Sequence, residues 1–138
     1  MGTSYVITAP LPPVTLTSVT ATPQTFNVNM TGMDTLTLDI DYTYVAGTAL
    51  IITLKAPKGL NDGTNARTFW VTDYASKTLA DATFTRTISA ASQRGIATFS
   101  LIPLGLTADS AGNIQVNVSV TNGTTDAVTI TPQVSRVG

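Results

Sequence analysis

Apolar and polar side chains alternate without interruption from Leu36 to Tyr44. Successive side chains of a strand point to opposite faces, so a period of two over this length predicts a strand with one buried and one wet face. A helix would instead need apolar residues three and four positions apart. The apolar positions are Leu36, Leu38, Ile40, Tyr42 and Tyr44, and the polar ones are Thr37, Asp39, Asp41 and Thr43.

The rest of the chain repeats short β-type runs between turn-forming residues. Thr is the commonest residue, Glu is absent and Lys is scarce, which favours pleated strands over helices. The nearly continuous apolar run Ala49–Lys55 predicts a central strand. We therefore predict an all-β chain that forms an antiparallel β-sandwich of about eight to nine strands, with either jelly-roll or immunoglobulin-like strand order. The other expected strands are Val14–Thr20, Thr25–Met30, Arg67–Tyr74, Thr83–Ser89, Gly95–Ile102, Ile114–Thr121 and Ala127–Val134.

One turn gives a specific pairing prediction. Asn122-Gly123 is a favoured two-residue hairpin turn, because both residue types tolerate positive φ. The strands on either side, Ile114–Thr121 and Ala127–Val134, are therefore expected to pair with each other as a hairpin.

The N-terminal residues 1–13 are expected to form an extended arm, because Pro fixes φ and restricts the residue before it. Such an arm is either a disordered terminus or a segment that lies across a neighbouring subunit. Residues 14–138 are then expected to form a single sandwich domain. In the second interpretation the arm supplies candidate interface residues, namely Pro10, Leu11, Pro12 and Pro13.

The chain lacks the side chains that most often carry out catalysis. It has no His, no Cys and no Glu, which are common acid–base groups, nucleophiles and metal ligands near neutral pH. No Ser lies in a Gly-x-Ser-x-Gly setting. We expect a non-enzymatic protein with no catalytic residues, no cofactor and no metal site.

The charge content restricts the partners. The formal net charge is −1, whereas nucleic acids and anionic membranes call for a basic patch, so we expect neither as a partner. Only 11% of the residues are charged, against about 25% in an average soluble protein. So few charges suggest that part of the surface is covered in the working state. The first residues carry no basic and apolar signal segment, which favours synthesis in a cytoplasm.

Two groups of residues could form sites, and each has a second interpretation. Asp39 and Asp41 project from one strand face about 7 Å apart, as in a Ca²⁺ site or a glycosidase pair; equally, they are charges on a solvated face that keep the strand from pairing with another chain. Trp70 and Tyr74 share a strand face and could form a platform for a sugar or an anchor for a protein. Alternatively, Trp70 is a core residue.

The chain closes on Val118-Ser-Val-Thr-Asn-Gly-Thr-Thr-Asp-Ala-Val-Thr-Ile-Thr-Pro132. Together with the proline-bearing arm and the absence of Cys and His, this pattern resembles virion structural proteins of tailed bacteriophages, in particular the small capsid decoration (cement) proteins. The resemblance implies a protein of the virion, assembled in the host cytoplasm. It also implies binding to the major capsid protein and to copies of itself, often as a trimer, and it assigns no site residues. The alternative is a carbohydrate-binding or adhesion module that uses Trp70 and Tyr74.

Overall fold

The computed structural model describes residues 6–33, 35–56, 67–68, 70–73, 78–81, 83–100 and 113–137. The described residues form strands and connecting turns and no helix, as predicted. Nine of the strands have five or more residues. The strands are β1 (Val6–Pro10), β2 (Val14–Val19), β3 (Gln24–Asn29), β4 (Thr35–Thr43), β5 (Ala49–Ala56), β6 (Arg67–Thr68), β7 (Trp70–Asp73), β8 (Thr78–Asp81), β9 (Thr83–Thr87), β10 (Gln93–Ser100), β11 (Asn113–Thr121) and β12 (Asp126–Val137).

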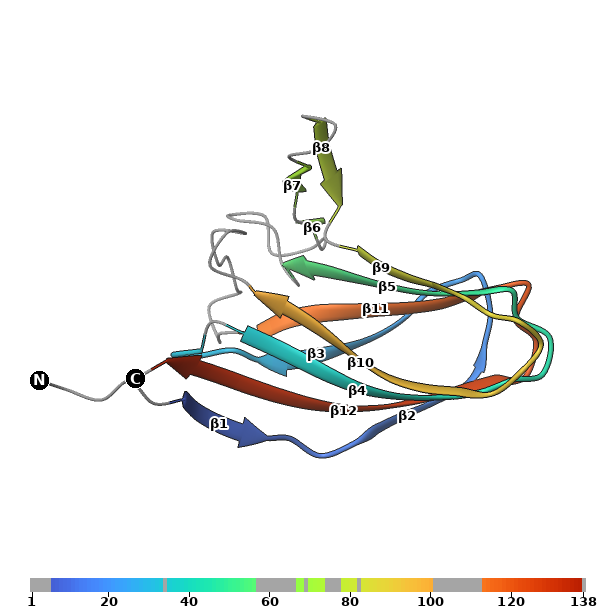
Figure 1. Ribbon diagram of the computed structural model, residues 1–138, viewed down its shortest axis with the longest axis horizontal. Helices are drawn as coiled ribbons and strands as arrows, with labels where there is room; N and C mark the ends of the chain where they lie inside the picture. Colours follow the sequence, from blue (N-terminus) through green and yellow to red (C-terminus); the bar gives the residue numbers. More distant parts are fainter. Residues whose placement is uncertain are drawn as a thin grey trace, which may run out of the picture.

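Two five-stranded antiparallel sheets lie face to face and confirm the sandwich (Figure 1). Sheet A has the order β1-β12-β4-β10, with β2 also paired to β12, and sheet B has the order β3-β11-β5-β6, with β9 also paired to β5. The chain changes sheet at every step from β2 to β5 and again from β9 to β12. The facing orders β2-β12-β4-β10 and β3-β11-β5-β9 are those of a jelly roll, so the structure decides between the two predicted topologies.

The core lies between the sheets and is built from alternate residues of each long strand. In β4 the positions Leu36, Leu38, Ile40 and Tyr42 are buried, as the alternation predicted. β5 lies between β11 and β9, so the predicted central strand is confirmed. The largest of the fully buried side chains are Leu36, Leu38, Ile52, Leu54, Ile114, Ile130, Val19, Val28, Val116, Val118 and Val120.

The predicted hairpin between Ile114–Thr121 and Ala127–Val134 is wrong. β11 pairs with β3 and β5 in sheet B, whereas β12 pairs with β1, β2 and β4 in sheet A. The two strands therefore face each other across the core and share no backbone ladder. The physical reason is that the intervening residues 122–125 cross from one sheet to the other: Asn122 has a φ of 58°, but Gly123 is not at positive φ.

Residues 6–10 of the expected arm are extended and form β1, which pairs with Gln133–Val137 at the end of β12. β2 pairs with the first part of the same edge of β12. Between β1 and β2, the amide of Leu11 donates a hydrogen bond to the carbonyl of Pro132 at 2.9 Å. β1, Leu11 and β2 therefore lie one after another along the same edge of β12. The predicted boundary between arm and domain at residue 13 stays a prediction.

Candidate functional site

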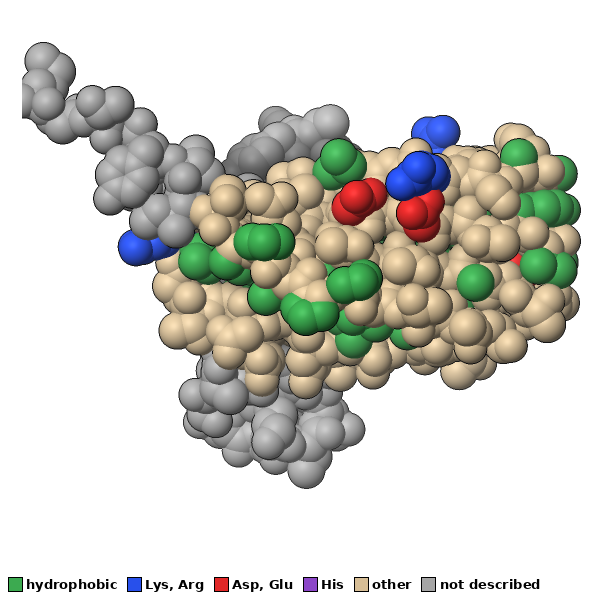
Figure 2. Space-filling view, turned by 90° about the horizontal axis from the view of Figure 1, so that it is seen from below, with side chains coloured by type: hydrophobic (Ala, Val, Ile, Leu, Met, Phe, Trp, Pro, Cys, Tyr) green, Lys and Arg blue, Asp and Glu red, His purple; other side chains and the backbone are tan. Residues whose placement is uncertain are grey.

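The outer face of sheet A is broad and carries few charges. Figure 2 views this side of the molecule and shows mostly uncharged side chains, with few acidic or basic groups. The charged residues on this face include Asp39 and Asp41 of β4 and Arg94 of the edge strand β10. The exposed and half-buried outward residues around them on β4, β10 and β12 are mostly hydroxyl and amide side chains: Thr35, Thr37, Thr43, Thr98, Thr129, Thr131, Gln133 and Ser135.

The predicted interface residues of the arm lie along the edge of this face. Pro10, Pro12 and Pro13 are exposed, whereas Leu11 is half-buried and packs against the core. Proline has no N–H to offer to an incoming strand, so three prolines blunt this edge of sheet A. The edge can still present apolar rings to a partner surface. Whether it binds a partner stays a prediction.

Asp39 and Asp41 lie on the solvated face. Asp41 forms an ion pair with Arg94, with 2.7 Å between Oδ1 and Nε. Both side chains are largely exposed, so this pair contributes at most about 1 kcal/mol to stability. Within the described part of the chain, no group of three or more His, Cys, Asp or Glu residues could hold a metal ion.

A groove of about 270 Å³ opens between the edge strands β9 and β10. Its apolar lining includes Ile40, Leu50, Phe84 and Ile88, whereas Ile96 borders it from β10 with a side chain on the outer face of sheet A. Gly95 faces this groove from β10, since its neighbour on β4 is the buried Ile40. A Cβ added to Gly95 would meet no atom within 4 Å, so the missing side chain leaves the groove open.

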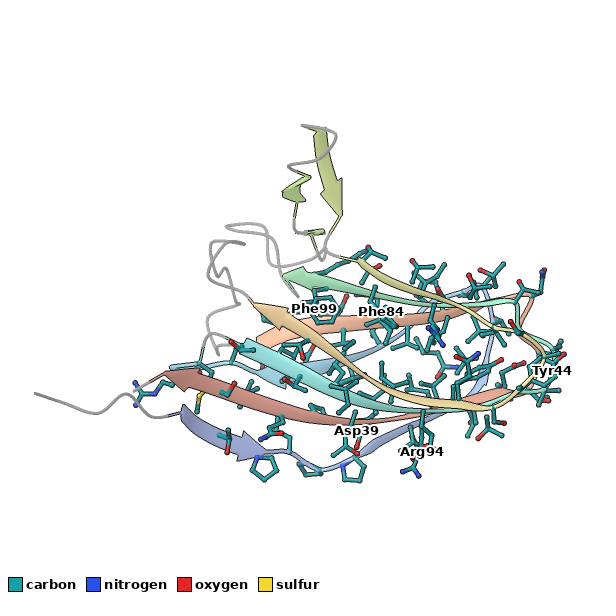
Figure 3. The ribbon with its side chains drawn as sticks, viewed as in Figure 1. Asp39, Tyr44, Phe84, Arg94 and Phe99 are labelled. Atoms are coloured by element: carbon teal, nitrogen blue, oxygen red, sulfur yellow. The ribbon has the colours of Figure 1, made fainter. Side chains whose placement is uncertain are left out.

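Two polar side chains lie at the mouth of the groove. Arg86 of β9 donates from Nε to Oε1 of Gln93 on β10 at 2.9 Å, which links the edges of the two sheets. Phe84 and Phe99 point into the space between the sheets, whereas Asp39 and Arg94 lie on the outer side of sheet A (Figure 3). The groove therefore has an apolar floor and a small polar rim.

Asp126 accepts hydrogen bonds from five described residues, and no sequence feature singled it out. It is fully buried at the start of β12. The Tyr42 hydroxyl donates to Oδ2, and so do the backbone N–H groups of Val45 and Gly47, each at 3.0 Å. The N–H groups of Ala46 at 3.2 Å and Thr124 at 3.1 Å complete the set.

This hydrogen-bond set controls the charge of the Asp126 carboxyl. Burial alone would raise its pKa, but the hydrogen bonds from Tyr42 and from the backbone of Thr124, Val45 and Gly47 outweigh burial and hold the pKa well below its usual range. Burial and the Asp126 carboxylate both raise the pKa of Tyr42 well above its ordinary value. Asp126 is therefore an ionised anchor that ties the turn after β4 to the start of β12.

No local signal in the sequence identifies this anchor. Asp126 follows Asn122-Gly-Thr-Thr, which is typical of any polar turn. Its partners in the turn after β4 are about 80 residues away in the chain, so only the crossing of β12 over to sheet A brings them together.

The structure does not test the remaining predicted site, the platform of Trp70 and Tyr74. Trp70 begins β7, which pairs with β8 in a two-stranded sheet outside the two large ones (Figure 1). Tyr74 lies outside the described residues. The Trp70–Tyr74 platform therefore stays a prediction.

Among the described residues, no helix is long and apolar enough to span a membrane.

No protein-family model and no characterised protein sequence matches the chain. Solved structures with a similar arrangement include the SPBc2 prophage-derived protein YomS, with 18% identity, a TM-score of 0.42 and coverage of 94% of this chain and 97% of that one. Pili of Bacillus endospore appendages give 8% identity and a TM-score of 0.47, covering 96% of this chain and 90% of theirs.

A putative sugar-binding protein from Bacteroides thetaiotaomicron gives 14% identity and a TM-score of 0.42, and covers 91% of this chain and 66% of that one. These values are too low to assign the chain to a family.

Proposed function

We propose that this protein is a non-enzymatic virion structural protein that binds and stabilises a phage capsid lattice. The observation that carries the proposal is the outer face of sheet A, which is broad, mostly uncharged and edged by Pro10, Pro12 and Pro13. A face rich in small hydroxyl side chains loses little solvation free energy when a partner covers it, because few charges must be stripped of water.

The strand order is compatible with this role and does not decide it. Jelly rolls occur in viral capsid proteins and also in lectins, and a fold alone does not fix a function. The choice therefore rests on the face and on the resemblance to capsid decoration proteins. The major capsid protein and further copies of this chain are the proposed partners.

The first test is the abundance of the chain in density-purified virions from its source, measured by quantitative mass spectrometry. A decoration protein should be present in numbers of the same order as the major capsid protein. A few copies per particle would contradict a lattice role and indicate the tail or portal. Absence from particles would overturn the virion proposal altogether.

The second test asks whether sheet A is the binding face. Gln133→Lys places an unpaired charge on β12 in this face, and Asn27→Lys places the same charge at an exposed position of β3 on the opposite face. We expect the Gln133 variant to bind capsids lacking the protein about tenfold more weakly or worse, because the added charge would be desolvated. Equal binding by both variants would rule out sheet A.

Deleting residues 1–13 would not test the arm's role cleanly. Deletion would take away β1 and expose the end of β12, and it would also remove Ala9 and Leu11 from the core. Weak binding by the truncated protein could then reflect damaged folding. Pro12→Glu changes an exposed arm residue, keeps the strand and isolates the arm's contribution.

A carbohydrate-binding module is the second candidate, and the outer face of sheet B favours it. Asn117 on this face is 8% exposed and donates from Nδ2 to Oε1 of Gln115 at 3.1 Å. Neighbouring amides and hydroxyls can hydrogen-bond to sugars in the same way. Glycan binding that is lost in a folded Trp70→Ala or Asn27→Ala variant would support this candidate. The outward residues of this face include Thr25, Asn27, Thr53, Thr83, Thr85, Gln115, Asn117, Ser119 and Thr121.

A further inference from the structure

The two edges of sheet A differ in how they are protected. At one edge β1 and β2 pair with β12, and Pro10, Pro12 and Pro13 offer no N–H donors there. On the other edge β10 pairs with β4, and no strand among the described residues pairs with its free side. Free N–H and C=O groups along an edge strand are a template for another strand.

β10 also lacks the usual devices that keep an edge strand single. Gln93–Ser100 contains no Pro and no Lys, and its one charged side chain, Arg94, is already paired with Asp41. Ile96 at its centre is 70% exposed and is one of two exposed large hydrophobic side chains in the described part of the chain, the other being Val45. The open groove with its apolar floor borders the same edge.

We propose that β10 pairs antiparallel with β10 of a second copy of this chain, about a two-fold axis that brings Ile96 opposite Ile96. Residues directly opposite in an antiparallel pair lie on the same face of the sheet. An axis at Ile96 therefore stacks the two exposed isoleucines and sets Arg94 opposite Thr98. Shifting the axis to Gly95 or Ala97 would instead place Ile96 opposite Arg94 or Thr98.

The charges of the outer face fit this register. In each copy Asp39 is the neighbour of Ile96 on β4, and Asp41 is the neighbour of Arg94. Across the axis, Arg94 and its bound Asp41 meet Thr98 and the neighbouring Thr37 of the second copy. No like charges are brought directly opposite, which would destabilise the pair.

The same pairing covers the groove. The second β10 would lie beside the first at the mouth of the groove, next to the position where Gly95 leaves space. A single contact would thus form main-chain hydrogen bonds, pack the two isoleucines against each other and cover the groove. The inference names the contact between copies that the proposed function includes, and it rests on that function for its setting only.

The first experiment measures the molar mass of the purified protein by light scattering and sedimentation, over concentrations that reach the millimolar range. We expect twice the mass of one chain at high concentration. Ile96→Lys should give one chain at every concentration, while Val45→Lys, which adds the same charge at the other exposed hydrophobic residue, should still form the dimer. A monomer or a trimer of the unaltered protein would overturn the proposal.

The second experiment tests the register, and it is clean because the chain has no Cys of its own. Opposite residues in an antiparallel pair have Cα atoms about 4.5–5.5 Å apart, within the range of a disulfide. Under mild oxidation Ile96→Cys should therefore form a cross-linked dimer, while Thr98→Cys alone should not. Mixing Arg94→Cys with Thr98→Cys should restore cross-linking between the two variants.

Cross-linking of Thr98→Cys alone at the rate of Ile96→Cys would overturn the register, and slow cross-linking of every variant would overturn strand pairing. These experiments contain no capsids. Failure here leaves the capsid proposal to its own tests, and failure of capsid binding leaves the dimer intact.

Discussion

Removing the hydroxyl group of Tyr42 should destabilise the protein more than its small size suggests. That hydroxyl is buried and donates to the Asp126 carboxylate, which is itself fully buried. Tyr42→Phe keeps the ring in the core and removes only this donor. Tyr44→Phe is the matched control, because Tyr44 is half-buried, lies close by in the chain, and donates no hydrogen bond from its hydroxyl to another residue that the structure describes.

The magnitude follows from the partner's charge. A hydrogen bond to an ionised group contributes about 1.5–3 kcal/mol, roughly twice a neutral one. The Tyr42→Phe change leaves the carboxylate with its backbone donors from Val45, Ala46, Gly47 and Thr124, so no larger collapse is expected. We expect the free energy of unfolding to fall by about 2 kcal/mol, against less than about 0.5 kcal/mol for Tyr44→Phe.

Urea unfolding followed by circular dichroism measures both values, and an unchanged m-value would show that the denatured state is unaffected. Combining Tyr42→Phe with Asp126→Asn closes a double-mutant cycle, in which direct coupling should appear as at least about 0.5 kcal/mol. Equal losses for Tyr42→Phe and Tyr44→Phe, or additive losses in the cycle, would refute the assigned role of this hydrogen bond.

Three further outcomes follow from the same structure. Folding lowers the pKa of Asp126, so the unfolded state binds more protons than the folded state in acid. The unaltered protein should therefore exceed Asp126→Asn in free energy of unfolding by the full amount above about pH 4, and by less as the pH falls further. Urea unfolding at several pH values measures this difference. Gly47→Ala should lower the free energy of unfolding by about 1–3 kcal/mol, since the new Cβ would contact Val120 and lie 2.6 Å from Tyr42 Oη. Gly95→Ala, where a Cβ would meet no atom within 4 Å, should change it by less than about 0.5 kcal/mol, and thermal unfolding measures both variants. Arg94→Gln should lower stability by at most about 1 kcal/mol, and a larger loss would mean that the exposed ion pair with Asp41 does more than its geometry indicates.

Much of the fold was predictable because its signals are local. The alternation in Leu36–Tyr44 assigned the buried face of β4 correctly, and the apolar run Ala49–Lys55 indicated a strand between two others. Both inferences use only the geometry of a single strand, in which successive side chains point to opposite faces. The candidate surfaces were partly predictable from the sequence too, since the low charge content indicated a surface suited to being covered.

The pairing of strands was not predictable in this way. Asn122-Gly123 indicated a hairpin, yet the chain crosses there between the sheets, where Gly123 fits closely against Val19 and Val120. Asp126 looked like one more turn residue until the crossing brought it to Tyr42 and the turn after β4. The periodicity of a strand predicts which of its faces is buried, but it does not predict which other strand pairs with it.

From its sequence this chain is therefore settled as an antiparallel β protein with a sparsely charged surface, because strand periodicity and composition act residue by residue. The jelly-roll order, the buried Asp126 anchor, the proline-blunted edge and the open edge at β10 arise only in the folded molecule. Each of them depends on contacts between segments far apart in the chain, and such contacts are fixed by how the two sheets share one core.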